Sequence, residues 1–224
     1  MRIAFLSDVH GNAIALDGCL QRARTLGVDT IYFLGDAVGY LPAAREVVDR
    51  LEGEGDRILC QQGNHEHMLF SGGATPERED AYRLTQARQQ LDADRLASIS
   101  SWPIRRELSC GWRKLLLVHG SPSLPLDGYV YPDTDLSTFG DLPYDAVVMG
   151  HTHRPFVREH RGKLFVNVGS VGLPRDHGNL AAFALYDDEA NAFEIVRVPL
   201  DVDAILAAYG DEIHDSVRAC LRRK

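Results

Sequence analysis

Five segments of this chain carry side chains that can bind metal ions, and each segment directly follows an apolar run. The side chains are carboxylates, imidazoles and one amide, a donor set that suits first-row divalent ions. They are Asp8 and His10 after "RIAFLS", Asp36 after "DTIYFLG", Asn64 and His65 after "RILCQQG", His119 after "KLLLV", and His151 and His153 after "DAVVMG". The other four histidines do not fit this pattern and are expected at the surface; they are His67, His160, His177 and His214.

Each of these segments also has an ordinary structural explanation. A polar residue after a strand is often a turn residue or a helix cap, and "GNHEH" at residues 63–67 could be a solvated loop. "GHTH" is more specific, because alternate residues of an extended segment point the same way and would bring His151 and His153 to one face. Five such segments after five strands favour a common site over unrelated turns.

The order of apolar runs predicts how these side chains are positioned. Short β-branched runs alternate with helical patterns in the first sixty residues, which indicates a βαβαβ unit with parallel strands. A first helix is expected over residues 12–27, with exposed polar helices over 75–91 and 92–100. Seven strand-like runs follow residue 102, and a helical end begins near residue 201. Ligands bind beyond the carboxyl ends of strands in open α/β sheets, so the polar side chains should converge.

Length and composition limit the class of protein. The 224 residues, 45% of them hydrophobic, can form one substantial core, so a single domain over residues 1–224 is expected. No run approaches the roughly 18 apolar residues of a membrane span, and "MRIAFLSDVHG" does not develop a secretory apolar segment, which favours a cytoplasmic location. The net charge of −8 opposes non-specific nucleic-acid binding. The four cysteines form no C-x-x-C pair, so neither a zinc knuckle nor a disulfide framework is expected.

The polar segments form an ordered set of motifs, "DVH", "GD", "GNHE", "VHG" and "GHTH", between residues 8 and 153. As a set they resemble the calcineurin-like metallophosphoesterase family, and "NVGSVGLPRD" at residues 167–176 resembles a further element of its small prokaryotic phosphodiesterase-like members. The resemblance implies an α/β fold, a four-layer αββα sandwich of two mixed β-sheets flanked by helices. It also implies hydrolysis of phosphate mono- or diesters of a small-molecule or nucleotide substrate.

The resemblance further implies a role for each motif residue. Two divalent ions are implied, the first held by Asp8, His10, Asp36 and His153 and the second by Asp36, Asn64, His119 and His151. His65 would face the substrate as the general acid for the leaving oxygen. This chain has "GDAVGYLP" where phosphoprotein phosphatases carry an Asp-Arg-Gly element, so no residue that orients His65 is identified from the sequence.

The charge of such a site suits phosphate. Two divalent ions bring four positive charges against two negative charges from Asp8 and Asp36, so an anion would be attracted. Attack by a hydroxide that bridges the metals would follow. The resemblance favours Mn²⁺ or Fe²⁺/Fe³⁺, while Zn²⁺, Ni²⁺ and Co²⁺ also suit mixed nitrogen and oxygen ligands.

Two further residues have two interpretations each. Asn12 either contacts phosphate or caps the first helix. Arg175 either binds phosphate through its guanidinium or forms an ion pair with Asp176. The loop from Ser121 to Asp133 is a candidate to cover the metals and affect specificity.

Other functions remain open at this level. Within the same chemistry they are dinucleotide polyphosphate hydrolysis and phosphoprotein dephosphorylation, although the missing Asp-Arg-Gly element argues against the latter. A binding scaffold on the same fold would have lost its ligands, whereas every motif position is filled here. A serine hydrolase is disfavoured because "HGSP" and "GSVG" do not supply G-x-S-x-G. No Walker A or G-x-G-x-x-G sequence is present.

Overall fold

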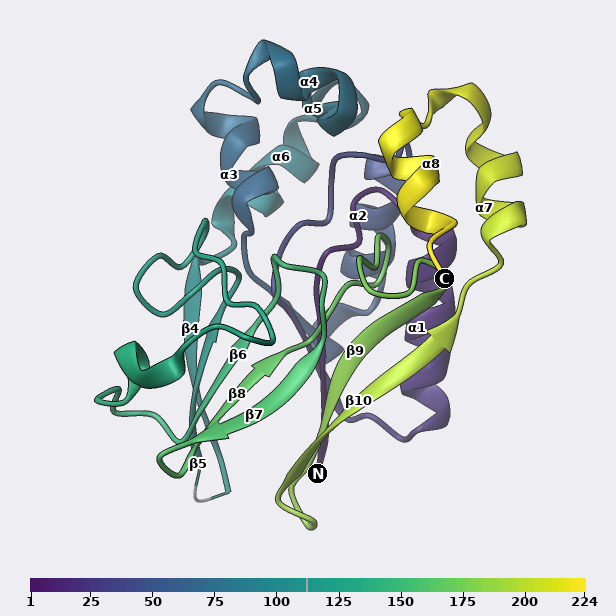
Figure 1. Ribbon diagram of the computed structural model, residues 1–224. Coiled ribbons are helices and arrows are strands. Elements are labelled where there is room, and N and C mark those ends of the chain that lie inside the picture. The colour runs from purple at the N-terminus through teal and green to yellow at the C-terminus, as the bar shows by residue number, and fades with distance from the viewer. Residues whose placement is uncertain (112) are drawn as a thin grey trace.

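The protein consists of two five-stranded mixed β-sheets surrounded by helices (Figure 1). The computed structural model describes residues 1–111 and 113–224, which contain eight α-helices. The α/β class with two mixed sheets flanked by helices is therefore confirmed. No helix in the described part of the chain is long and apolar enough to cross a membrane.

The first sheet contains the predicted parallel unit. Its order is β10-β9-β1-β2-β3, with β1 (Arg2–Leu6), β2 (Thr30–Phe33), β3 (Ile58–Cys60), β9 (Leu180–Asp187) and β10 (Ala192–Pro199). Strands β1, β2 and β3 are parallel, while β9 and β10 add antiparallel pairs. The register pairs the last residue of β1 with that of β2 and the last of β2 with that of β3, so all three end at one edge.

The second sheet repeats this arrangement with a parallel centre. Its order is β4-β5-β6-β8-β7, with β4 (Arg105–Cys110), β5 (Arg113–Val118), β6 (Ala146–Met149), β7 (Phe156–His160) and β8 (Lys163–Asn167). Strands β5, β6 and β8 are parallel, and the edge strands β4 and β7 are antiparallel to their neighbours. All seven strands predicted after residue 102 are present across the two sheets.

The central strands are buried on both faces, as parallel strands usually are. In β1, Ile3 and Phe5 pack between the sheets, while Ala4 and Leu6 pack toward the helices. Strand β5 alternates in the same way, with Leu115 and Leu117 between the sheets. One apolar layer therefore joins the two sheets and fixes their relative position.

Helices cover the first sheet and the rim. They are α1 (Ala13–Thr25), α2 (Ala44–Gly53), α3 (Asn64–Ser71), α4 (Pro76–Tyr82), α5 (Leu84–Gln90), α6 (Ala93–Ser101), α7 (Val202–Tyr209) and α8 (Asp215–Leu221). Figure 1 shows α3 to α6 grouped above one side of the sheets and α7 and α8 above the other. The outer face of the second sheet packs against the segment containing the 3-10 helix η2 (Leu136–Phe139).

Two details differ from the sequence expectation. The helix expected over residues 75–91 is two helices, because Arg83 adopts a left-handed conformation with φ of 56° between them. Helix α3 has no helical signal in the sequence, because the residues it buries include His65 and Glu66, so its inner face is not an apolar stripe.

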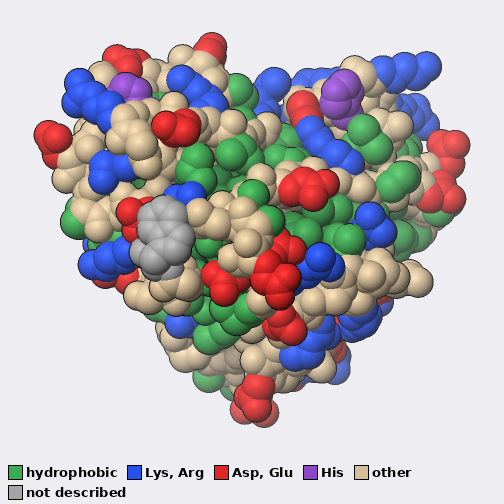
Figure 2. Space-filling view, turned by 90° about the horizontal axis from the view of Figure 1, so that it is seen from below, with side chains coloured by type: hydrophobic (Ala, Val, Ile, Leu, Met, Phe, Trp, Pro, Cys, Tyr) green, Lys and Arg blue, Asp and Glu red, His purple; other side chains and the backbone are tan. Residues whose placement is uncertain are grey.

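The charges of the chain are spread over the face seen in Figure 2. This view is from below, the end at which the N-terminus lies in Figure 1. Acidic and basic side chains are interspersed there, with hydrophobic side chains between them. The net charge of −8 is therefore not gathered into a single acidic patch on this face.

Candidate metal centre

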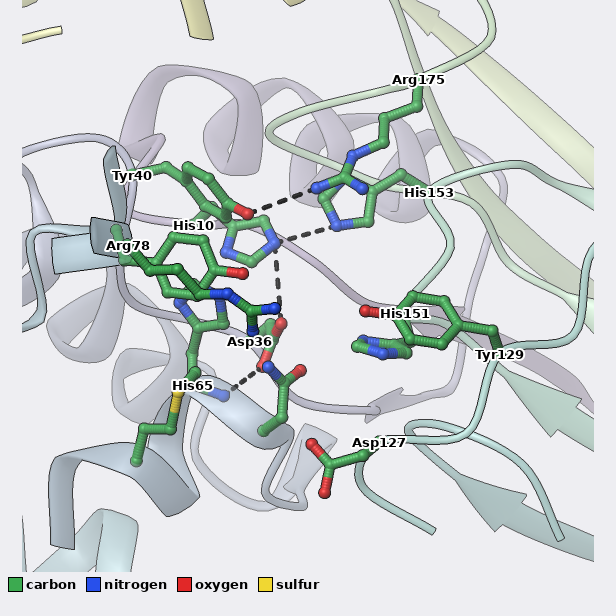
Figure 3. Close-up of a pocket in the computed structure, with 13 residues that line it drawn as sticks. His10, Asp36, Tyr40, His65, Arg78, Asp127, Tyr129, His151, His153 and Arg175 are labelled. Carbon is green, nitrogen blue, oxygen red and sulfur yellow. Dashed lines mark hydrogen bonds and ion pairs between the residues drawn. The ribbon is translucent and has the colours of Figure 1, made fainter. Parts of the chain in front are cut away.

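The polar segments meet at the rim where the parallel strands end. Two segments follow β1 and β2, and their loops are joined by backbone hydrogen bonds from Asp8 N–H to Gly35 O (3.0 Å) and from His10 N–H to Asp36 O (2.9 Å). Figure 3 shows the side chains of His10, Asp36, His65, His151 and His153 facing a common cavity. The predicted convergence is thus seen in the structure.

The first group of potential ligands comprises Asp8, His10 and His153. The Nε2 atoms of His10 and His153 are 3.0 Å apart, and Asp8 Oδ1 lies 3.2 Å from the Nε2 of His153 and 3.7 Å from that of His10. All three residues are buried. Their ligand atoms are close enough to hold one metal ion.

The second group comprises Asp36, His119 and His151, with Asn64 beside it. His119 Nε2 lies 3.1 Å from Asn64 Oδ1, 3.2 Å from His151 Nδ1 and 3.3 Å from Asp36 Oδ2. The same Asp36 oxygen is 3.6 Å from His10 Nε2, so it lies close to both groups. A third combination, His10 with Asp36 and His65, is also compact enough for a metal ion.

The protonation of three histidines is set by backbone carbonyls. Their Nδ1 atoms face oxygens at hydrogen-bond distance: His10 to Val38 O (3.2 Å), His119 to Leu34 O (3.1 Å) and His153 to Leu173 O (2.6 Å). A carbonyl oxygen only accepts, so each Nδ1 carries the proton and the Nε2 lone pair points into the site.

These lone pairs converge with few hydrogen-bond donors among them. Asp8 Oδ1 is buried and accepts no hydrogen bond, and the Nε2 atoms of His10 and His153 face each other at 3.0 Å. Buried polar atoms without partners are costly, and a cation would satisfy several acceptors at once. The residues present therefore fit a metal-binding function.

The backbone is strained at the same positions. Residues with positive φ include Asp8 (58°), His10 (51°), Asp36 (60°), His151 (65°) and His153 (57°). This left-handed conformation is unfavourable for residues with a Cβ and tends to occur at functional sites. The fold therefore holds these five side chains in position against their local backbone preference.

Burial and mutual charge shift the pKa values of the group. Burial would raise the pKa values of Asp8 and Asp36, but neighbouring histidines outweigh it and hold both below their ordinary range. Burial would lower the pKa of His119, but Asp36 and Asp8 outweigh it and raise this pKa to about 9. At His151 burial dominates and lowers the pKa to about 4. The buried carboxylates are thus ionised, and their charge favours a cation beside His119, either a proton on its Nε2 or a metal ion in place of that proton.

His65 lies within a group of aromatic rings. Its ring packs against those of Tyr40 and Tyr82, with centroid distances of 5.1 and 4.8 Å and interplanar angles of 28° and 31°, and the two tyrosine rings are 4.9 Å from each other. Its backbone N–H donates to Asp36 Oδ1 at 2.9 Å, and its buried Nδ1 has no hydrogen-bond partner. The two tyrosines provide the support for this ring that the sequence pattern did not reveal.

Glu66 is fully buried and fixes the loop that carries Asp36. Its carboxylate accepts hydrogen bonds from four backbone N–H groups, those of Asp36 (2.7 Å), Ala37 (2.8 Å), Val38 (3.3 Å) and Gly63 (2.8 Å). Burial and the charge of Asp36 raise the pKa of Glu66 to about 7, while these N–H groups oppose the rise. The last residue of "GNHE" therefore has a positioning role.

The two remaining site candidates differ in their surroundings. Asn12 Oδ1 accepts from Ala15 N–H at 3.1 Å, and its Nδ2 donates to Gly172 O at 3.0 Å. The predicted helix cap is confirmed, and the fully buried amide has both ends engaged. Arg175 instead reaches the cavity and donates to Tyr40 Oη at 3.3 Å.

The site opens into a cavity of about 270 Å³, called the metal chamber below. Its wall contains residues that the sequence analysis did not single out, namely Tyr40, Met68, Arg78, Tyr82, Asp127 and Tyr129. Asp127 and Tyr129 belong to the loop expected to cover the site, and the Tyr129 ring lies 4.2 Å from that of His151. Figure 3 shows the guanidinium groups of Arg78 and Arg175 on the cavity side of their chains.

Comparison with known proteins identifies the family. The sequence profile of the calcineurin-like phosphoesterase superfamily domain matches residues 1–191. The chain belongs to this family. It is 30% identical over 220 residues to the uncharacterized protein MJ0912 of Methanocaldococcus jannaschii, covering 89% of this chain and 88% of that protein.

Two further relatives carry functional names. Phosphodiesterase YfcE of Escherichia coli is 26% identical over 192 residues, covering 84% of this chain and 89% of YfcE. A metallophosphoesterase structure from Sphaerobacter thermophilus is 28% identical with a TM-score of 0.82, covering 99% of this chain and 98% of that one. Membership of this family and the clustered His and Asp side chains indicate a metal-dependent phosphoesterase hydrolase.

Proposed function

We propose that this chain is a dinuclear-metal phosphoesterase that hydrolyses phosphate mono- or diesters of a small-molecule or nucleotide substrate. The observation that carries the proposal is the convergence of buried acceptor atoms into two groups with Asp36 between them. A site for one cation would not need an acidic oxygen close to both groups. Dinucleotide polyphosphate hydrolysis is a narrower form of the same chemistry.

The proposed ligand sets follow these two groups. Asp8, His10, Asp36 and His153 would hold one ion, and Asp36, Asn64, His119 and His151 would hold the other. Mn²⁺ and iron are the proposed ions, and Zn²⁺, Ni²⁺ and Co²⁺ suit the same ligands. When bound, two such ions neutralise phosphate oxygens and lower the pKa of water enough to supply a nucleophile near neutral pH.

The chain's own residues would complete the reaction. His65 is buried beside Asp36 and lines the chamber wall, so its ring can direct a proton to the leaving oxygen. Burial lowers the pKa of His65 although Asp36 opposes this, and a bound phosphate anion would raise it again. Arg175 and Arg78 lie in the chamber wall, where a guanidinium can donate to phosphate oxygens.

The two competing functions have less support. A scaffold would not need the buried, unpartnered acceptors or the strained ligand backbones. For a serine hydrolase, Ser170 donates its hydroxyl to Asp8 O at 2.7 Å, and Ser121 contacts Ser123 Oγ at 3.4 Å. Neither hydroxyl is hydrogen-bonded to a histidine within the described structure.

The test is hydrolysis of p-nitrophenyl phosphate and bis(p-nitrophenyl) phosphate by the purified protein with each candidate metal. We expect activity with Mn²⁺ that is abolished in His119→Ala, since this residue lies within 4 Å of Asn64, His151 and both carboxylates. His177→Ala changes an exposed histidine and should remain active. Inactivity with every metal and ester would support the scaffold. Activity that survives chelators, with a covalent serine probe on Ser121 or Ser170, would support a serine hydrolase.

A further inference from the structure

A second cavity of about 430 Å³ adjoins the metal chamber. Tyr40, Tyr82 and Arg175 line both cavities, so these side chains form their common wall. Arg154 and Arg223 line the second cavity but not the metal chamber, and no carboxylate lines the second cavity among the described residues. We call this cavity the arginine chamber.

The three arginines are not neutralised by ion pairs. Within the described part of the chain, Arg154, Arg175 and Arg223 form no ion pair with a carboxylate, and Asp176 pairs with Arg197 instead of its neighbour Arg175. Several arginines elsewhere do form ion pairs, such as Arg57 with Glu54 at 2.7 Å. Three uncompensated positive charges around one cavity contrast with the net charge of −8.

The arginine chamber is built on the same turns as the metal centre. Arg154 directly follows His153, and the N–H of Arg175 donates to His153 O at 3.2 Å. Arg223 Nη1 donates to Arg175 O at 2.7 Å, which ties the C-terminal segment to this turn. Figure 3 shows the Arg175 side chain beside His153 and directed toward Tyr40. A ligand that spans both chambers would therefore meet Arg175 at their junction.

We propose that the arginine chamber binds a second phosphate group of the substrate while the first phosphate lies at the metal centre. The substrate class is thus an ester with two separated phosphate groups. Guanidinium groups recognise phosphate through paired N–H donors, and unpaired arginines leave these donors available. A substrate with one phosphate and an apolar remainder would leave the charges of Arg154 and Arg223 without a partner.

This inference rests on the proposed phosphoesterase function, and its test measures binding rather than hydrolysis. The ligands are α,ω-alkane bisphosphonates from ethane to hexane, each compared with the monophosphonate of the same chain length. Their P–C bonds are not hydrolysed, so calorimetric titration of the metal-loaded full chain reports affinity alone. We expect at least one bisphosphonate to bind about tenfold more tightly than its monophosphonate. The double variant Arg154→Gln with Arg223→Gln should lose this preference.

The control double variant is Arg22→Gln with Arg45→Gln, which makes the same change in net charge on exposed positions of α1 and α2. It should keep the preference for bisphosphonates. Equal affinities in the wild type, or equal losses in both double variants, would overturn the proposal. The single variants at Arg154 and Arg223 are also measured, so that a poorly folded double variant does not decide the result. Failure of the proposed hydrolytic function would give a different result from failure of this inference. The p-nitrophenyl esters would then not be hydrolysed, while the preference for bisphosphonates over monophosphonates would persist.

Discussion

His65 is the residue whose role depends most on its immediate surroundings. It is 2% exposed, packed against the rings of Tyr40 and Tyr82 and adjacent to Asn64, whose side chain faces His119. Two neighbours at the start of α3 thus point to different partners, Asn64 to the second ligand group and His65 to the open chamber. This division explains why an amide and an imidazole stand side by side after β3.

A general acid can be recognised by its dependence on the leaving group. In His65→Ala we expect kcat for phenyl phosphate to fall by about 10²-fold or more. The loss for p-nitrophenyl phosphate should be smaller, because p-nitrophenolate leaves without a proton. Steady-state rates over a series of aryl phosphates measure this difference.

The control for that series is His67→Ala, which changes an exposed histidine on the same helix. It should leave the dependence on the leaving group unchanged. If His65→Ala lowers all rates by the same factor and also lowers the bound metal, His65 acts as a ligand, as its proximity to His10 and Asp36 allows.

At the level of elements, the sequence predicted which polar residues follow the ends of strands. It did not predict which side chains surround those residues. Asp8, Asp36 and His119 follow apolar runs that had to become parallel strands, and parallel strands bring their carboxyl ends to one edge. The convergence of Asp8 and Asp36 at one edge therefore followed from the topology of the first sheet. The pairing of the two sheets then decided which ligands meet across the rim.

The chamber wall depends on interactions that no local pattern contains. Tyr40 lies in a loop, Tyr82 ends α4, and Tyr129 belongs to the long loop after β5. In the sequence each of these tyrosines looks like an ordinary loop or helix residue. Only the packing of the elements brings its ring into the chamber wall. Glu66 was similarly hidden, because a glutamate in a helix is usually exposed.

The loop after β2 can be tested through Gly39, which lies against the His65 ring. A Cβ at Gly39 would come within 2.2 Å of His65 Nδ1, and the residue has φ of 92°. In Gly39→Ala we expect kcat to fall by about tenfold or more because the general acid is displaced. Metal content, measured by elemental analysis, should be retained.

Gly27→Ala is the matched control for this substitution. Gly27 also has positive φ, at 66°, but an added Cβ would meet nothing within 4 Å. This variant carries similar backbone strain without contact with the site, so its stability should fall while its kcat is kept. Equal loss of kcat in both variants would show that strain, and not displacement of His65, is responsible.

At the scale of the whole molecule, the metal centre lies between the two sheets. Asp8, His10 and Asp36 come from the first sheet, whereas His119 and His153 come from the second. Close contacts cross between the sheets, with 3.0 Å from His10 to His153 and 3.3 Å from Asp36 to His119. Bound cations would therefore link the two sheets at the rim, in addition to the apolar layer between them.

Metal binding should accordingly stabilise the entire fold. A ligand that binds only the folded state at about 100 times its dissociation constant adds about 2.7 kcal/mol. For a protein of this size that corresponds to an increase in Tm of roughly 5–10 °C. We expect this increase in calorimetry when Mn²⁺ is added to chelator-treated protein.

In His119→Ala the increase should be much smaller, because one ligand from the second sheet is lost, whereas His177→Ala should respond like the wild type. An unchanged Tm in the wild type, or an equal increase in His119→Ala, would contradict a metal centre that joins the sheets.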